Sequence, residues 1–266
     1  LRKIGAVGVS LDDNKIHPTI AGLLMFGYEY EIVREFPGYF LDYQERFDES
    51  IRWTHRTISS SGDWSGNLFD FYFRVIYRLS SDLNIPFVLN GITRVDNTEL
   101  HVALREALLN TLVHADYYGR QGTVIIRTPQ MITFSNPGDM RISLRAAVGG
   151  GVSDPRNAVL IKMFSLIGVG ERAGMGIPGL LDIWQRLTGM APIYASQFSP
   201  NRVTVSMQIK MIGDKSVING GSGDKSAINS VIGNKSAIKG GNSDKESSSV
   251  EKKLCMIIEY MQTHQN

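Results

Sequence analysis

Apolar residues recur along this chain with two different periods, which predict where helices and strands form. A spacing of three or four residues indicates amphipathic helices over residues 68–83, 98–114, 154–168 and 177–187. Alternating or compact β-rich runs predict strands over residues 39–43, 123–127, 131–135 and 202–209. Pro129-Gln130 separates the second strand from the third and predicts a hairpin. A short apolar run over residues 20–27, after a loop ending at His17-Pro18-Thr19, predicts a small buried helix.

The pattern divides the chain into zones. Residues 1–97 are mixed, residues 98–210 are dense in apolar periodicity, and residues 211–249 are polar and repetitive. Gly-Asp-Lys-Ser occurs at 213–216 and 223–226, and Gly-Asn-Lys-Ser at 233–236. Each repeat offers too little apolar surface to offset the entropy of ordering, which favours a flexible linker over its rival, a marginal β-ladder. Residues 250–266 read as a helical start of a further domain.

The composition excludes several classes of protein. The net charge of +2 neither requires nor excludes a nucleic-acid partner, and one cysteine, Cys255, excludes a disulfide framework or a cysteine-based zinc site. No run of about 18 apolar residues is present, and the N-terminus lacks a signal-peptide core, so we expect a cytoplasmic protein without a membrane partner. Because the chain begins at Leu1, we expect a fragment of a longer protein.

A polar stripe runs along the predicted helix over residues 98–114. Glu106, Asn110 and His114 stand four residues apart and share one side, with Ala103 and Ala107 beside them. The alanines leave room for a ligand, although a solvated helix face would show the same spacing. A glutamate can act as a general base on water, and an amide oxygen is a ligand that suits Mg²⁺.

Three loops carry further candidate chemistry. Residues 135–139 contain Asn-Pro-Gly, which predicts a turn that is either plain or lets a flat base approach. Residues 168–179 contain five glycines before a helix, which suits an anion at the helix N-terminus or a plain connector. Residues 149–157 read as a mobile lid in which Arg156 either pairs with a phosphate or caps locally.

These segments, in this order, resemble the divergent GHKL-type (HATPase) ATP-binding domain of bacterial regulators called RecG-related or AlbA-domain proteins. The resemblance rests on residues 104–117, the turn at 136–138, Arg156-Asn157 and residues 171–177, and it covers about 98–210. Residues 1–97 are similar to the region that follows the AlbA-like domain in that family, most clearly over residues 19–27. Residues 250–266 resemble the beginning of the family's winged-helix domain.

The resemblance implies a fold and a set of roles. The implied fold is α+β, a Bergerat-type sandwich with helices on one face of a mixed sheet, preceded by a small α/β segment and followed by the linker. Glu106 would orient the attacking water, and Asn110 would bind Mg²⁺. His114, on the same helix face, would contact the nucleotide. Asn136 and Gly138 would meet adenine, while Gly174, Gly176 and Arg156 would lie near the phosphates. The family usually has an aspartate where Asn136 stands, which puts adenine selectivity in doubt.

The resulting expectation is an ATP- and Mg²⁺-binding module of a cytoplasmic transcriptional or defence-type regulator. Nucleotide would order the lid and reposition flanking DNA-binding domains outside this chain, hydrolysis would be slow, and a homodimer is left open. The alternative is a degenerate scaffold that keeps the fold for dimerisation or partner docking and binds no nucleotide. A helicase is not expected, because the sequence has no P-loop.

Overall fold

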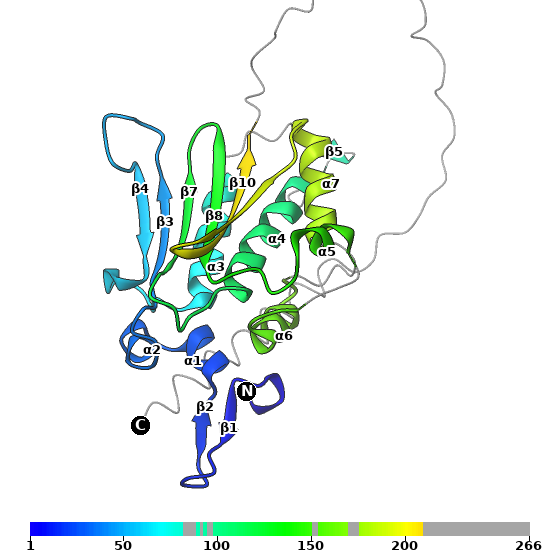
Figure 1. Ribbon diagram of the computed structural model, residues 1–266. Helices are drawn as coiled ribbons and strands as arrows, with labels where there is room; N and C mark the ends of the chain where they lie inside the picture. Colours follow the sequence, from blue (N-terminus) through cyan, green and yellow to red (C-terminus); the bar gives the residue numbers. More distant parts are fainter. Residues whose placement is uncertain (82–88, 91–92, 95–97, 151–153, 170–175, 210–266) are drawn as a thin grey trace, which may run out of the picture. The chain divides into compact units, whose positions relative to one another are not determined.

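Six strands form one mixed sheet in this computed structural model, which describes residues 1–81, 89–90, 93–94, 98–150, 154–169 and 176–209. The strands are β3 (Leu41–Glu45), β4 (His55–Ile58), β7 (Thr123–Arg127), β8 (Met131–Pro137), β9 (Ile193–Phe198) and β10 (Asn201–Gln208). Their order is β4-β3-β7-β8-β10-β9 (Figure 1). The β3–β7 pair is parallel and every other neighbouring pair in this sheet is antiparallel.

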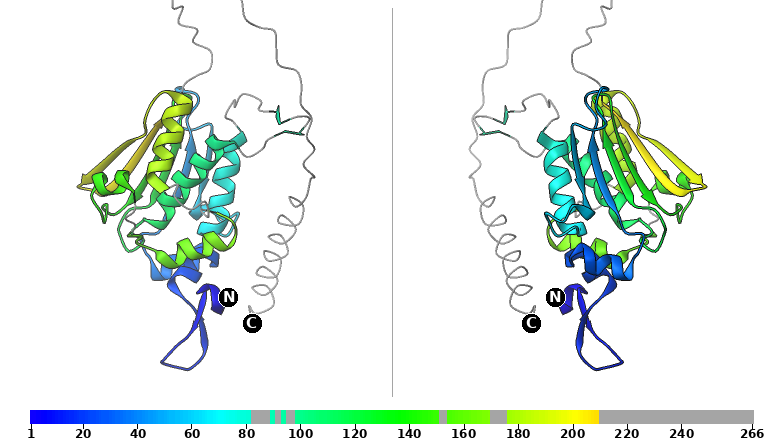
Figure 2. Two further views of the ribbon diagram at one scale, coloured as in Figure 1. Left: turned by 90° about the vertical axis from the view of Figure 1, so that its right-hand side faces the viewer. Right: turned by 90° about the vertical axis from the view of Figure 1, so that its left-hand side faces the viewer.

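Helices cover one face of this sheet. The longer ones are α3 (Leu68–Ser81), α4 (Glu99–Val113) and α7 (Gly176–Thr188). The shorter ones are α1 (Ile20–Phe26), α2 (Glu29–Glu35), α5 (Leu144–Gly149) and α6 (Ala158–Leu166). In the two side views, α3, α4 and α7 lie on the same side of the strands, and no described helix lies on the other side (Figure 2). No helix of the described residues is long and apolar enough to span a bilayer.

Two further strand pairs lie outside the main sheet. They are β1 (Val7–Val9) with β2 (Ile16–Pro18), and β5 (Leu89–Asn90) with β6 (Thr93–Arg94). The β1–β2 hairpin precedes α1, whose first turn is capped by Thr19: its Oγ1 accepts a hydrogen bond from Gly22 N at 3.0 Å. Gly22 must be a glycine here, because a Cβ would stand 1.8 Å from the Ala6 carbonyl oxygen.

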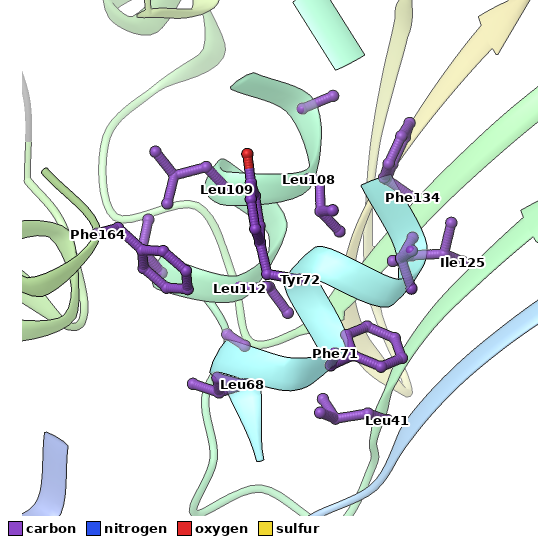
Figure 3. Packing of buried hydrophobic residues seen from close by; sticks show 14 of the residues in the cluster. Leu41, Leu68, Phe71, Tyr72, Leu108, Leu109, Leu112, Ile125, Phe134 and Phe164 are labelled. Carbon is purple, nitrogen blue, oxygen red and sulfur yellow. The ribbon is translucent and has the colours of Figure 1, made fainter. Parts of the chain in front are cut away.

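The main core fills the space between the helices and the sheet. Phe71 of α3 points toward Ile125 and Leu41 of the sheet, whereas Tyr72 of the same helix lies beside Phe164 of α6 (Figure 3). Leu108 and Leu112 of α4 belong to the same buried cluster. The sheet contributes residues at every second position, since the period of a strand is two. Leu41, Ile125 and Phe134 are the labelled examples, and all are fully buried.

The predicted helices and strands of the core are present with small changes of boundary. The helix expected from Asp154-Pro155 begins at Ala158 instead, because Asn157 is its N-cap residue. The loop expected to end at His17-Pro18 contains strand β2. Helices α2 and α5 and strands β4 and β9 were not expected from the sequence.

The main sheet takes strands from both sides of residue 97, so local periodicity could not show how it is assembled. Strands β3 and β4, from the first zone, pair with β7 from the second zone, and residues Leu1–Met211 form one compact unit. The reason is the parallel β3–β7 pair, which joins segments about 80 residues apart in a way that local periodicity cannot reveal. The linker expected at 211–249 and the helical start expected at 250–266 lie outside the described residues.

Candidate functional site

A cavity of about 360 Å³ lies between α4, the sheet, α5 and the beginning of α7. Its apolar wall comes from the helix-covered face of the sheet and from α7, through Tyr194, Val203, Val205, Ile177 and Leu180. Its polar groups come from α4, the end of β8 and the segment after it, through Asn110, Thr111, His114, Asn136, Asp139, Arg141 and Asp154. Mixed cavities of this size are typical of small-molecule sites.

Four residues singled out in the sequence line this one cavity. They are Asn110, His114, Asn136 and Gly176. Three others do not line it. Glu106 and Arg156 are hydrogen-bonded to the lining residues Asn110 and Asp139, and Gly138 directly precedes Asp139. Gly174 lies outside the described residues. The structure therefore brings together residues that are as far as 66 positions apart in the sequence (110 to 176).

Glu106 and Asn110 form a pair on α4. Asn110 Nδ2 donates a hydrogen bond of 3.1 Å to Glu106 Oε1. An ionised carboxylate only accepts hydrogen bonds, so the amide nitrogen must face Glu106, which leaves Asn110 Oδ1 directed elsewhere. Burial raises the pKa of the Glu106 carboxyl above its usual value, and the bond from Asn110 opposes that rise.

His114 ends the polar stripe at the C-terminus of α4. Its backbone N–H donates to Asn110 O at 3.1 Å, and its side chain lines the cavity. Burial lowers the pKa of the imidazole, and the Arg156 guanidinium lowers it further. At neutral pH the ring is therefore uncharged, and it offers one donor and one acceptor to a ligand.

Asn136 belongs to strand β8, whereas the sequence suggested that it lies in a turn. The strand continues to Pro137, because Asn136 pairs with Val203 and Pro137 with Arg202 of β10. The chain turns at Gly138, which has a φ of 96°. A side chain there would be strained by that φ and would also meet Arg156 Nη2 at 3.1 Å.

The Asn136 side chain is 6% exposed and faces the helix-covered side of the sheet, as Phe134 does. Its Nδ2 donates to Pro137 O at 3.2 Å. Among the described residues, nothing donates a hydrogen bond to its Oδ1. An acceptor in the wall of a cavity is thus open to a ligand with an amino group.

Arg156 and Asn157 tie the end of α4 to the segment before α6. Arg156 donates to His114 O at 3.2 Å and forms an ion pair of 2.9 Å with Asp139. Asn157 Nδ2 donates to Val113 O at 3.0 Å and to Ala115 O at 2.8 Å. Of the two roles open for Arg156 in the sequence, phosphate contact and local capping, this arrangement is the local one.

Other residues of the cavity were not recognised in the sequence. Tyr194 lies on β9, which was not predicted, and burial raises the pKa of its hydroxyl, with the charge of Glu106 as a second cause. Arg141 and Asp154 form an ion pair of 2.9 Å. Thr111 sits next to the stripe on α4, and its hydroxyl donates to Ala107 O at 2.7 Å. Only Thr111 carried a signal, since its position follows from the helix period.

Replacing Glu106 by glutamine should raise the melting temperature at neutral pH. The folded-state pKa of Glu106 lies above its usual value of 4.5, so the folded state loses stability as the carboxyl ionises. Glutamine avoids that cost, and its carbonyl oxygen still accepts the bond from Asn110. The gain should shrink below about pH 4, where the wild-type carboxyl is protonated in both states. Thermal melts at acidic and neutral pH measure it, and a variant less stable at neutral pH would contradict the expectation.

The comparisons with known proteins concern the fold more than this cavity. Residues 1–42 match a family described as a domain of unknown function, DUF8451. No curated protein matches the chain. Among solved structures, the chain is similar to the crystal structure of the DIP2311 protein from Corynebacterium diphtheriae, with a TM-score of 0.56 and 16% identity over 78% of this chain. The matched region spans 33% of that protein's length, and at this identity the likeness is one of fold alone.

Proposed function

We propose that the cavity beside α4 binds an adenine nucleotide with Mg²⁺, and that the chain is an ATP-binding module of a transcriptional or defence-type regulator. One observation carries the proposal. Asn110, His114, Asn136 and Gly176 were selected from the sequence as nucleotide contacts, and all four line the same cavity. Asn110 and His114 lie together through the helix period alone, but Asn136 comes from β8 and Gly176 from the beginning of α7.

The wall of the cavity suits a purine base. Val203 and Val205 offer flat apolar surface, which a base can cover, and Asn136 stands beside them on β8. The free Oδ1 of Asn136 can accept a hydrogen bond from the exocyclic amino group of adenine. This bond is weaker than one to a carboxylate, so we expect modest affinity and modest selectivity for adenine.

Asn110 suits a magnesium ion that arrives with phosphate. Its amide nitrogen is held by Glu106, which leaves its oxygen as a hard ligand for the cation. Phosphate oxygens and water would complete the coordination, as Mg²⁺ commonly retains several waters in proteins. Bound there, the ion would offset the phosphate charge.

The position of Glu106 favours a role in nucleotide binding over a role in nucleotide hydrolysis. Its carboxylate orients Asn110 and does not itself line the cavity. A general base must come within hydrogen-bond reach of the water it activates, directly or through one further water. We therefore propose nucleotide binding as the activity and expect hydrolysis, where it occurs, to be slow. DNA would be met by flanking domains outside this chain.

A scaffold without nucleotide is the second candidate, and one observation favours it. Among the described lining residues, Arg141 is the only arginine or lysine, and it is already paired with Asp154. Arg156 nearby is paired with Asp139. A polyphosphate would have to displace a carboxylate from one of these arginines.

The decisive experiment is a thermal melt of the full chain with and without millimolar Mg-ATP. A ligand at about 100 times its dissociation constant adds about 2.7 kcal/mol, which corresponds to a rise of roughly 5–10 °C for a chain of this size. Asn110→Ala should abolish the rise, because it removes the cation ligand. Asn201→Ala, an exposed asparagine in β10, is the matched control and should keep it. An unchanged wild-type melt would favour the scaffold.

A further inference from the structure

In the part of the chain that the structure describes, strand β9 forms an edge of the main sheet, and its own sequence lacks the usual protection. Its sequence is Ile-Tyr-Ala-Ser-Gln-Phe, without a charge or a proline, and four consecutive residues, 195–198, are exposed. Natural edge strands are commonly shortened, charged, bulged or interrupted by proline, because a bare edge pairs with other strands. The opposite edge, β4, follows that rule: it is four residues long and carries His55 and Arg56.

The neighbouring ladder shows which backbone groups of β9 point outward. Asn201 O accepts a hydrogen bond of 3.1 Å from Gly138 N, on the side of β10 that faces β8. Directions alternate along an antiparallel strand, so Arg202, Thr204 and Ser206 face β9 instead. Their partners there are Gln197, Ala195 and Ile193. The other three residues of β9 direct their N–H and C=O groups away from the sheet: Tyr194, Ser196 and Phe198.

We propose that this edge pairs antiparallel with the same edge of a second copy of the chain, with Ser196 opposite Ser196 of that copy on a two-fold axis. This register places Tyr194 opposite Phe198 and uses all three outward-facing residues of each strand. A shift by one residue would set outward groups against inward ones, and a shift by two would leave groups unpaired. The contact is isologous and therefore closes as a dimer.

The side chains of β9 are complementary to those of β9 in a second copy of the chain. The Phe198 side chain is 94% exposed in the single chain. In the paired edge it lies across from Tyr194 of the second copy, on the same face of the sheet, and aromatic cross-strand pairs stabilise sheets. No like charges meet, because β9 carries none.

The dimer would reach the cavity described above. Tyr194 lines that cavity, so Phe198 of the second copy would pack beside one of its walls. The dimer itself does not depend on nucleotide binding, since the contact is made by backbone groups and exposed side chains of β9.

The test is sedimentation equilibrium of the full chain over a range of concentrations. We expect a concentration-dependent dimer for the wild type. Ser196→Lys and Ser196→Glu each set like charges directly opposite each other, and each should weaken the dimer by about fivefold. An equimolar mixture of the two variants should dimerise again, because opposite charges then meet on the axis.

Gln197→Lys is the matched control. It adds the same charge one residue away, where the register places Ala195 of the second copy opposite, so the dimer should persist. Ser196 is exposed, and circular dichroism should show that all three variants fold as the wild type does. A chain that stays monomeric at every concentration would overturn the proposal. So would a dimer that Ser196→Lys leaves unchanged, or a mixture of charge variants that fails to recover.

Discussion

Replacing Trp184 by alanine is expected to lower the free energy of unfolding by about 3–5 kcal/mol, the cost of removing a large buried aromatic side chain. The Trp184 side chain is fully buried on α7, and its Nε1 donates a hydrogen bond of 2.9 Å to Gln208 O of β10. Alanine would leave a void between α7 and the sheet and would deprive that carbonyl of a partner. A thermal melt should show a decrease of roughly 10 °C for a chain of this size.

Trp184→Phe separates the two contributions. Phenylalanine keeps a buried aromatic ring but is smaller than tryptophan and has no N–H, so we expect a cost of about 2 kcal/mol, smaller than that of alanine. Equal losses for phenylalanine and alanine would contradict a packing role. Because α7 supplies Ile177 and Leu180 to the cavity wall, the alanine variant should also show a smaller Mg-ATP shift than the phenylalanine variant.

The helices of the core could be predicted from the sequence because each buries one stripe. In α3, Leu68, Phe71, Tyr72, Val75 and Leu79 are buried, and their spacing is that of a helix face. The hairpin of β7 and β8 was equally visible, since both strands are rich in β-branched and aromatic residues and a proline separates them. Local pattern suffices where an element buries a regular set of its own residues.

The edge strands could not be predicted in the same way. All four residues of β4 are half-buried, and five of the six residues of β9 are exposed or nearly so, which leaves no alternation to detect. Their strand character comes from pairing with β3 and β10, which is a tertiary effect. The parallel β3–β7 pair is likewise invisible to local reasoning, because it joins segments about 80 residues apart.

The candidate site also contains parts that the sequence could predict and parts that it could not. The helix period put Asn110 and His114 on one stripe, and the resemblance to GHKL-type domains added Asn136 and Gly176, all of which line the cavity. What the sequence could not give is the partner of each group. Arg156 looked free to bind phosphate, but it is paired with Asp139 and with the end of α4, 42 residues away in sequence.

Replacing Arg78 by methionine is the second change with a large expected effect. Arg78 of α3 donates two hydrogen bonds to Glu45 of β3, at 2.9 and 2.6 Å, and Tyr43 OH donates a third at 2.9 Å. The Glu45 side chain is only 3% exposed, so the variant would leave a buried carboxylate without its cation. We expect a cost of about 3 kcal/mol, the low end for a buried pair, because Arg78 is 37% exposed and water partly solvates the contact.

Lowering the pH should reduce the stability cost of Arg78→Met. The direction of this pH dependence shows whether the cost comes from the unpaired Glu45 carboxylate. In the wild type, burial raises the pKa of Glu45, but the hydrogen bonds from Arg78 and Tyr43 outweigh it and hold the pKa below its usual value. The pair therefore stabilises the fold above the usual glutamate pKa of 4.5 and loses that effect as the pH falls through the lowered folded-state pKa. Without Arg78, burial dominates and Glu45 prefers to be protonated, so the variant becomes less stable as the pH rises. The difference between the two proteins should be greatest at neutral pH and smallest below about pH 4.

Glu45→Gln combined with Arg78→Met provides the control for this reading. Removing both charges avoids the unpaired carboxylate, so the double variant should be more stable at neutral pH than Arg78→Met alone. Denaturant unfolding of the four proteins at two pH values gives the coupling between the two side chains directly. A double variant less stable than Arg78→Met, or a difference that does not change with pH, would show that Arg78 acts through its apolar stem and not through Glu45.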